Sequence, residues 1–181
     1  LYRRATDSIR TVDKNHIILL GGPQWNSNFE PFADWTFDDN IMYTCHRYGG
    51  DATAEAIASY IAFRDSTNLP MYMGEIGHNT DEWQSAFCDV LEQNNIGYTF
   101  WPYKKVDGSC MMGITRPAGW DSLVVAFAEA PRCSYSDIRA ARPDRKAARE
   151  ALDAFVEASR FENCTPQKGY IRSIKLNPDN N

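Results

Sequence analysis

Four short apolar segments recur along the first hundred residues at a nearly even spacing. They are rich in aliphatic, β-branched and aromatic residues, as strands are, and they cover residues 16–22, 40–48, 71–77 and 98–104. Their starting positions, 16, 40, 71 and 98, are 24, 31 and 27 residues apart. This spacing leaves room for a helix between consecutive strands and predicts parallel βαβ units.

Apolar residues with helical spacing lie around and between these segments. The helices predicted from them are a first one carrying Tyr2, Ala5 and Ile9, a second over residues 54–62 and a third over residues 83–91. The gap at residues 23–39 differs, because it is rich in Pro, Asn, Asp and aromatic residues. We expect a long loop there, with at most a short helix.

The chain beyond the fourth strand is predicted to be mostly helical. A loop over residues 106–119 leads to a helix over 120–127, and a long amphipathic helix begins at Pro143-Asp144, a favourable first turn. The tail at residues 167–176 is expected to add a short peripheral strand. No low-complexity linker interrupts the chain.

Composition and charge narrow the possible partners. The charged share of 24% and the hydrophobic share of 43% are those of an ordinary globular protein. A net charge of −5 argues against a nucleic-acid partner or an anionic membrane surface, since both favour a basic face. No apolar run reaches the roughly 20 residues of a membrane span. The chain opens inside a helical pattern without Met, so we expect it to be cut from a longer protein.

The cysteines do not indicate a metal site. Five are present, and none forms a CxxC pair: Cys45, Cys88, Cys110, Cys133 and Cys164. The first two lie in apolar segments and are expected to be buried thiols, whereas the last three lie in loops, where a disulfide is possible. The triplet at 163–165 fits the glycosylation acceptor pattern, a faint indication that the protein is secreted or periplasmic.

Polar residues gather at the carboxyl ends of the predicted strands. Side chains alternate across a strand, so residues two apart share a face. The sets expected to share a face are Met42, Thr44, His46 and Tyr48; Met71, Met73 and Glu75; and Thr99 and Trp101. Parallel α/β folds build their sites at this end of the sheet. We therefore expect His46, Tyr48, Glu75 and Trp101 to meet in one pocket.

A structural explanation competes with a functional one for each of these residues. An ionised carboxylate in a buried strand needs partners, which favours a function for Glu75. His46 and Trp101 could instead be core residues, and for Trp25 packing and substrate binding are equally plausible. His78, just after Glu75, could line a substrate subsite. His16 opens a strand at the opposite end and is expected to be structural.

With these residues in place, the pattern resembles glycoside hydrolase family 5, the cellulase family. His46-Arg47-Tyr48 is similar to the His-x-Tyr ending that family's sixth strand, residues 73–77 to its Gly-Glu nucleophile motif, and Phe100-Trp101 to the end of its eighth strand. The resemblance runs over residues 2–130. It implies an α/β fold, the C-terminal half of a (β/α)₈ barrel with strands 5–8, made of a barrel half at 1–130 and C-terminal helices and tail at 131–181.

The resemblance also implies a reaction, the endo-acting hydrolysis of β-glycosidic bonds with retention. Glu75 would attack the anomeric carbon as the nucleophile, Tyr48 would donate a hydrogen bond to it, and His46 would bind substrate hydroxyls or support it. Trp101 would stack under a sugar, with Trp25 and His78 as further substrate contacts. No metal or organic cofactor is implied. The partner is a polysaccharide or oligosaccharide, with β-glucan favoured and mannan or another hemicellulose open.

Half of the expected site is missing from this chain. The family's acid/base glutamate follows an Asn at the end of the fourth strand, and no such pair occurs here. The missing N-terminal half of the barrel is thus an expected partner, and the isolated chain is expected to be inactive. Two other functions remain open, a non-catalytic carbohydrate-binding module using Trp25, Trp101 and Tyr103, and a structural half-barrel that dimerises.

Overall fold

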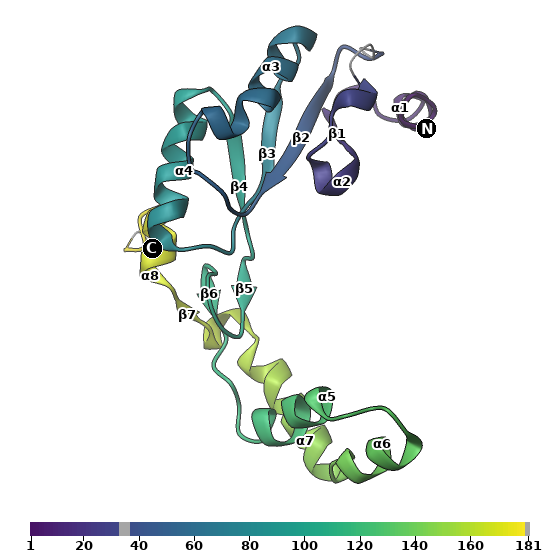
Figure 1. The fold of residues 1–181 in the computed structure, drawn as a ribbon, viewed down its shortest axis with the longest axis vertical. Coiled ribbons are helices and arrows are strands. Elements are labelled where there is room, and N and C mark those ends of the chain that lie inside the picture. The colour runs from purple at the N-terminus through teal and green to yellow at the C-terminus, as the bar shows by residue number, and fades with distance from the viewer. Residues whose placement is uncertain (33–36, 180–181) are drawn as a thin grey trace. The chain divides into compact units, whose positions relative to one another are not determined.

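The computed structural model describes residues 1–32 and 37–179 (Figure 1). The described chain forms two compact units. Residues 1–102 and 168–181 make up the first, called here the sheet unit, and residues 103–167 make up the second, called the insert unit. Each is described by itself. The domain limits expected from the sequence, at residues 130 and 131, stay a prediction.

The sheet unit contains the four predicted strands and the helices around them. The strands are β1 (Ile18–Gly21), β2 (Ile41–Arg47), β3 (Met71–Gly77) and β4 (Gly97–Trp101). The helices are α1 (Tyr2–Arg10), α2 (Pro23–Asn26), α3 (Ala58–Thr67), α4 (Asp81–Gln93) and α8 (Lys168–Ser173), with 3₁₀ turns at Glu30–Phe32 and Glu55–Ile57. Of the helices in the described ranges, none is long and apolar enough to cross a lipid bilayer. The loop predicted at residues 23–39 contains the short helix α2 and the 3₁₀ turn Glu30–Phe32. Its residues 33–36 lie outside the described ranges.

The four strands form one parallel sheet in the order β1-β2-β3-β4. Helices α3 and α4 lie along the same side of it (Figure 1). The hydrophobic core of the sheet unit includes Leu20, Ile41, Tyr43, Cys45, Met71, Met73 and Ile76 near or on the strands and Ile57, Tyr60, Phe87, Cys88 and Leu91 near or on these helices. Parallel strands in sequence order with helical connections are the arrangement of a (β/α)₈ barrel. The expected α/β fold class is confirmed.

A β-bulge in β3 changes which of its residues share a face. Met73 pairs with Cys45, but the next pair joins Glu75 to His46, so Gly74 is an extra residue on β3. The pairing with β4 skips the same place. The bulge lets two consecutive residues, Gly74 and Glu75, turn toward the face of the sheet that carries His46.

The expectation that Met71 and Met73 share a face with Glu75 is therefore wrong. Both methionines are buried on the helix side of the sheet, and Met73 Sδ lies 3.7 Å from the Cys45 thiol. The regular alternation expected from the sequence holds on β2 and β4, where Tyr43, Cys45 and Phe100 pack into the same core.

The strand expected over residues 167–176 is also wrong, because Lys168–Ser173 form helix α8. The buried residues Tyr170 and Ile171 of this helix, and Ile174 just after it, follow a helical spacing rather than a strand alternation. Helix α8 packs on α4, and the Tyr170 hydroxyl donates a hydrogen bond to the Trp101 carbonyl at 3.2 Å. The tail therefore belongs to the sheet unit, although the 65 residues of the insert unit, 103–167, come between it and β4 in the sequence.

The insert unit is a small mixed structure. Its elements are β5 (Lys104–Lys105), β6 (Met112–Gly113), β7 (Thr165–Pro166), a π-helical turn at Trp120–Val125, α5 (Ala126–Glu129), α6 (Tyr135–Ala141), α7 (Arg145–Ala158) and a 3₁₀ turn at Phe161–Asn163. Asp144 caps α7 by accepting from the Ala147 amide at 2.9 Å, as its place before the helix indicates. Trp120 stacks on Phe155 with ring centroids 4.1 Å apart. Helix α6 was not predicted.

All five cysteines are free thiols. Cys45 and Cys88 are buried, as predicted, and burial raises the pKa of Cys45 to about 12 and that of Cys88 to about 11. Cys110 and Cys164 are buried as well, and Cys133 is exposed. The disulfide considered for the last three cysteines is not formed.

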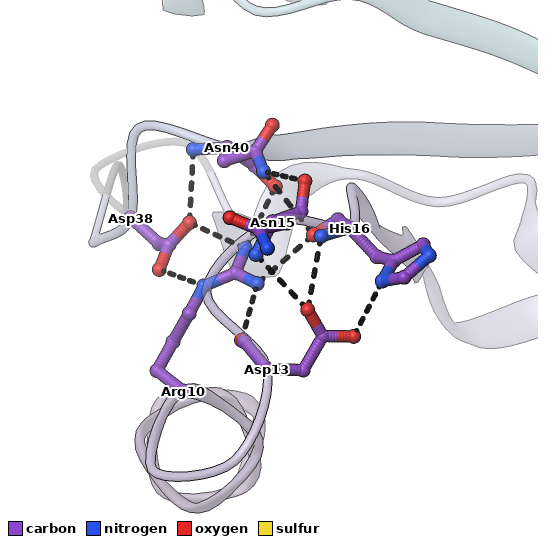
Figure 2. A network of polar contacts seen from close by, with 6 residues as sticks. All are labelled: Arg10, Asp13, Asn15, His16, Asp38 and Asn40. Carbon is purple, nitrogen blue, oxygen red and sulfur yellow. Dashed lines mark hydrogen bonds and ion pairs between the residues drawn. The ribbon is translucent and has the colours of Figure 1, made fainter.

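A polar network joins the end of α1 to the segments that enter β1 and β2 (Figure 2). Arg10 forms two hydrogen bonds with the Asp38 carboxylate, at 2.8 and 2.9 Å, and also donates to the carbonyls of Asp13, His16 and Asn40. The hydrogen bonds from Arg10 hold the pKa of Asp38 below its usual range. His16, expected to be structural, contacts Asp13 here at 2.7 Å.

Candidate active site

Glu75 and His46 lie beside each other at the carboxyl ends of β3 and β2. They are register partners across the parallel pair. The Tyr48 hydroxyl, just past β2, donates a hydrogen bond to Glu75 Oε2, and His46 Nδ1 lies 3.4 Å from the same oxygen. The predicted contact between Tyr48 and Glu75 is confirmed. Both groups meet the carboxylate on one oxygen, and among the described residues no hydrogen bond or ion pair involves the other oxygen, Oε1.

The β3 bulge is fitted closely to its neighbours. A Cβ atom at Gly74 would lie 2.4 Å from Thr44 Oγ1 and 3.1 Å from His46 Nε2, so only glycine fits there without displacing them. On the other side, the Thr99 hydroxyl donates to the Gly74 carbonyl at 2.5 Å. Neighbours on β2 and β4 therefore hold the bulge, and with it the direction of Glu75.

The loop after β2 is tied to the start of α4. The Asn79 side chain donates to the Tyr48 carbonyl at 2.9 Å, and the Trp83 indole donates to the Gly50 carbonyl at 2.6 Å. The Thr80 hydroxyl caps α4 by accepting from the Trp83 amide. These contacts fix the backbone that carries Tyr48. Sequence reasoning did not identify this supporting contact of Asn79.

Trp101 ends β4 and pairs with Gly77 of β3. Trp101 is 53% exposed, on the face opposite the partly buried Phe100. The face predicted for it is therefore the observed one. Its backbone is held by Tyr170, as described above, and its ring is open to solvent at the same end of the sheet as Glu75.

Among the described residues, the hydrogen bond and the ion-pair contact of Glu75 are with Tyr48 and His46 and do not include Trp25 or His78. Trp25 is 91% exposed on a turn after β1. His78 follows β3 with a φ of 53°, and it is exposed. Their expected roles as substrate contacts stay predictions.

Asn26 is the polar residue of this region that sequence reasoning missed. Its side-chain nitrogen lies 3.0 Å from His46 Nε2. The position follows β1 by five residues, inside the segment expected to be a loop. The Gly21-Gly22-Pro23 turn was the signal that the chain bends back over the sheet here.

The site provides one carboxylate, that of Glu75, held by a phenol and an imidazole at the carboxyl end of a parallel sheet. The Glu75 side chain is 32% exposed, so it can contact a ligand. Within residues 1–32 and 37–179, no group of three or more His, Cys, Asp or Glu side chains could hold a metal ion. A carboxylate of this kind can act as a nucleophile or as a general base.

Comparison with known proteins points in one direction. Residues 1–106 match the family model "Cellulase (glycosyl hydrolase family 5)". An endoglucanase of Clostridium saccharobutylicum is 28% identical in an alignment of 126 positions that covers 62% of this chain and 28% of that protein. Endoglucanase A of Butyrivibrio fibrisolvens is 40% identical in an alignment of 72 positions that covers 38% of this chain and 16% of that protein.

Solved structures of similar proteins include the mannohexaose complex of the Thermomonospora fusca β-mannanase. The mannanase is 26% identical to this chain, and the match covers 59% of this chain and 38% of the mannanase chain with a TM-score of 0.46. The chain spans about a quarter of the length of the first curated relatives it matches, 28% and 25%. Since the family model matches 106 of 181 residues, including Glu75 and its neighbours, the chain belongs to glycosyl hydrolase family 5, the cellulase family.

Proposed function

We propose that this chain carries the nucleophile of a retaining glycoside hydrolase that cleaves β-linked polysaccharide, and that Glu75 is that nucleophile. The observation that carries the proposal is the contact of Tyr48 and His46 with one oxygen of the Glu75 carboxylate. Hydrogen-bond donors on Oε2 hold the Glu75 carboxylate in one direction, which leaves Oε1 to attack the anomeric carbon.

The reaction proceeds in two displacements. In the first, a Glu75 oxygen bonds to the anomeric carbon, the glycosidic C–O bond breaks, and a general acid protonates the leaving oxygen. In the second, water attacks the same carbon, the acid group now takes a proton from that water, and Glu75 is released. The anomeric configuration is retained because it is inverted twice.

The general acid is expected outside these residues. Tyr48 and His46 are the polar partners of Glu75 in this structure, and neither is a second carboxyl group. Retaining enzymes place the two carboxyl groups about 5–5.5 Å apart. We expect the second one on another strand end of the complete barrel, which makes the remainder of the barrel a partner of this chain.

The substrate is proposed to be β-glucan or β-mannan. The curated relatives are named endoglucanases, one is named a β-mannanase/endoglucanase, and mannanase structures hold mannohexaose. Trp101, half exposed at the strand ends, offers an apolar ring on which a sugar can stack. Action on a polysaccharide also favours a location outside the cytoplasm, secreted or periplasmic.

The test replaces the nucleophile in the protein at full length. Glu75→Gln should reduce turnover of β-glucan and β-mannan by at least about a thousandfold while leaving substrate binding largely intact, because covalent catalysis needs the carboxylate. Glu92→Gln is the matched control. Glu92 also accepts a tyrosine hydrogen bond, from Tyr98 at 2.8 Å, but it lies on α4.

A fluorinated glycoside should label the enzyme, and peptide mass spectrometry should locate the label. A label on Glu75 supports the proposal. A label on another carboxylate, or undiminished turnover by Glu75→Gln, contradicts it. Binding of oligosaccharide without any turnover would instead favour a carbohydrate-binding module.

A further inference from the structure

We infer that Asn26 is a positioning residue for this site, because it fixes the tautomer of His46 and so the donor that His46 presents to Glu75. The inference rests on the proposed function for the role of Glu75. The contact itself is independent of that role, since it joins Asn26 Nδ2 to His46 Nε2 at 3.0 Å.

Asn26 reaches His46 through an unusual turn. Gln24, Trp25 and Asn26 have φ values of 55°, 55° and 59°, so α2 contains three consecutive residues in the left-handed region. Non-glycine residues visit this region one at a time, and Asn is among those that tolerate it. Such backbone persists only where its surroundings hold it, and here it turns the amide back over the sheet.

The end of β1 leaves room for the amide. A Cβ atom at Gly21 would lie 2.2 Å from Asn26 Oδ1 and 2.7 Å from Asn26 Cγ. The amide group therefore packs directly on the Gly21 backbone, and on its other side it meets the imidazole of His46. Glycine at position 21 is a condition for this placement.

The two ring nitrogens of His46 have different partners, and these partners determine which nitrogen carries the proton. His46 Nδ1 faces the Glu75 carboxylate, which accepts hydrogen bonds and cannot donate when it is ionised. A neutral imidazole that donates to this carboxylate has its proton on Nδ1 and a lone pair on Nε2. An N–H group of Asn26 meets that lone pair, which excludes the tautomer with the proton on Nε2.

For the reaction, the consequence is that each group donates to the next: Asn26 donates to His46 Nε2, and His46 Nδ1 donates to Glu75. The imidazole therefore keeps its Nδ1 proton directed at the carboxylate while Glu75 attacks. Without Asn26 the ring can rotate or change tautomer and present a lone pair to the carboxylate instead. The proposed nucleophile would then lose one of its two supporting groups.

Asn26→Asp in the protein at full length is the decisive variant. It keeps the shape and tolerates the left-handed backbone, but it replaces the N–H donor with an acceptor. We expect ¹⁵N NMR of labelled histidine to show a proton on His46 Nε2 in this variant, with the resonance assigned by His46→Gln. We also expect kcat to fall about tenfold or more, the change that corresponds to one hydrogen bond, with KM little changed.

Two further variants separate this role from general damage. Gly21→Ala should produce the same tautomer change and rate loss, because it displaces the amide without altering either partner. Asn68→Asp is the matched control. Asn68 also has a left-handed backbone, with a φ of 53°, but it ends α3 and precedes the amino end of β3, opposite the carboxyl end that carries Glu75. The variant should therefore keep the tautomer and kcat.

An unchanged His46 tautomer in both Asn26→Asp and Gly21→Ala would overturn the inference. So would a changed tautomer with undiminished kcat. Failure of the proposed function is seen separately, as turnover that survives Glu75→Gln, and the NMR result still decides whether Asn26 fixes the ring.

Discussion

Tyr48 is the closest supporting group of the Glu75 carboxylate, and removing its hydroxyl gives a clean test at the scale of a single residue. Tyr48→Phe keeps the ring and deletes one hydrogen bond to a charged acceptor. Such bonds are worth about 1.5–3 kcal/mol, so kcat in the protein at full length is expected to fall roughly tenfold to a hundredfold.

The chain offers a matched control for this change. Tyr98 also donates to a glutamate, Glu92, but its partner lies on α4. Tyr98→Phe should leave kcat on β-glucan and β-mannan unchanged. Equal loss in the two variants, measured by steady-state kinetics, would show that the effect of Tyr48→Phe is structural rather than local to Glu75.

The principal residues of the candidate site could be predicted because strand ends mark them. His46, Tyr48 and Glu75 each lie at the carboxyl end of a segment with clear strand character, and parallel strands bring such ends together. Asn26 could not be found in this way. Its contact depends on a left-handed turn, and no apolar periodicity records the φ values of a loop.

At the scale of the element, β3 shows where alternation fails as a guide. Counting by two puts Glu75 on the face of Met73, yet Met73 is fully buried on the helix side and Glu75 pairs with His46. The inserted Gly74 reverses the count. A glycine within a strand is the sequence signal for such a bulge, but it does not say which side the next residue takes.

Helix α8 was mistaken for a strand for a related reason. Residues 167–176 are few, and short apolar runs fit both periods. Packing against α4 decides the outcome, because it buries Tyr170, Ile171 and Ile174 together. The longer helices α4 and α7 have enough turns for the helical spacing of their apolar residues to be recognised in the sequence.

The Arg10–Asp38 pair gives a prediction on pH at the same scale. Because hydrogen bonds from Arg10 lower the pKa of folded Asp38, the carboxylate stabilises the fold above the unfolded pKa of about 3.9. This contribution is lost as the pH falls through the lower pKa of the folded state. Asp38→Asn should therefore lower the denaturation midpoint at pH 7 and have little effect near pH 2.

Urea denaturation of the protein at full length, at both pH values, measures this difference. Asp65→Asn is the control, because Asp65 pairs with Arg64 at the surface with 62% of its side chain exposed. Exposed pairs contribute little to stability, so its midpoint should stay close to that of the unchanged protein. A constant deficit for Asp38→Asn from pH 7 to pH 2 would contradict the linkage.

At the scale of the whole molecule, we predict that the 181-residue chain alone has no glycosidase activity and is not a well-behaved monomer. In the described residues, β1 and β4 each pair on one side only, and open strand edges attract other chains. Ile17 and Leu19, at β1, are about half exposed. Uncovering several hundred Å² of apolar surface costs on the order of 10 kcal/mol, comparable to the stability of a domain.

Light scattering, thermal melting and assays on β-glucan and β-mannan check this prediction. We expect association or partial order, and recovery of activity when the remainder of the barrel is added in trans. A cooperative, monomeric and active 181-residue product would contradict it. The second carboxyl group of the reaction would then have to be sought among these residues.

The hydrogen bond between Tyr170 and the Trp101 carbonyl bears on how this protein can evolve. It joins the two segments of the sheet unit that flank residues 103–167 in the sequence. The entropy of closing a loop grows only slowly with its length, so the segment between such tied ends can be lengthened, shortened or exchanged at small thermodynamic cost. The position after β4 is therefore suited to the gain and loss of whole modules, while the sheet and Glu75 remain as they are.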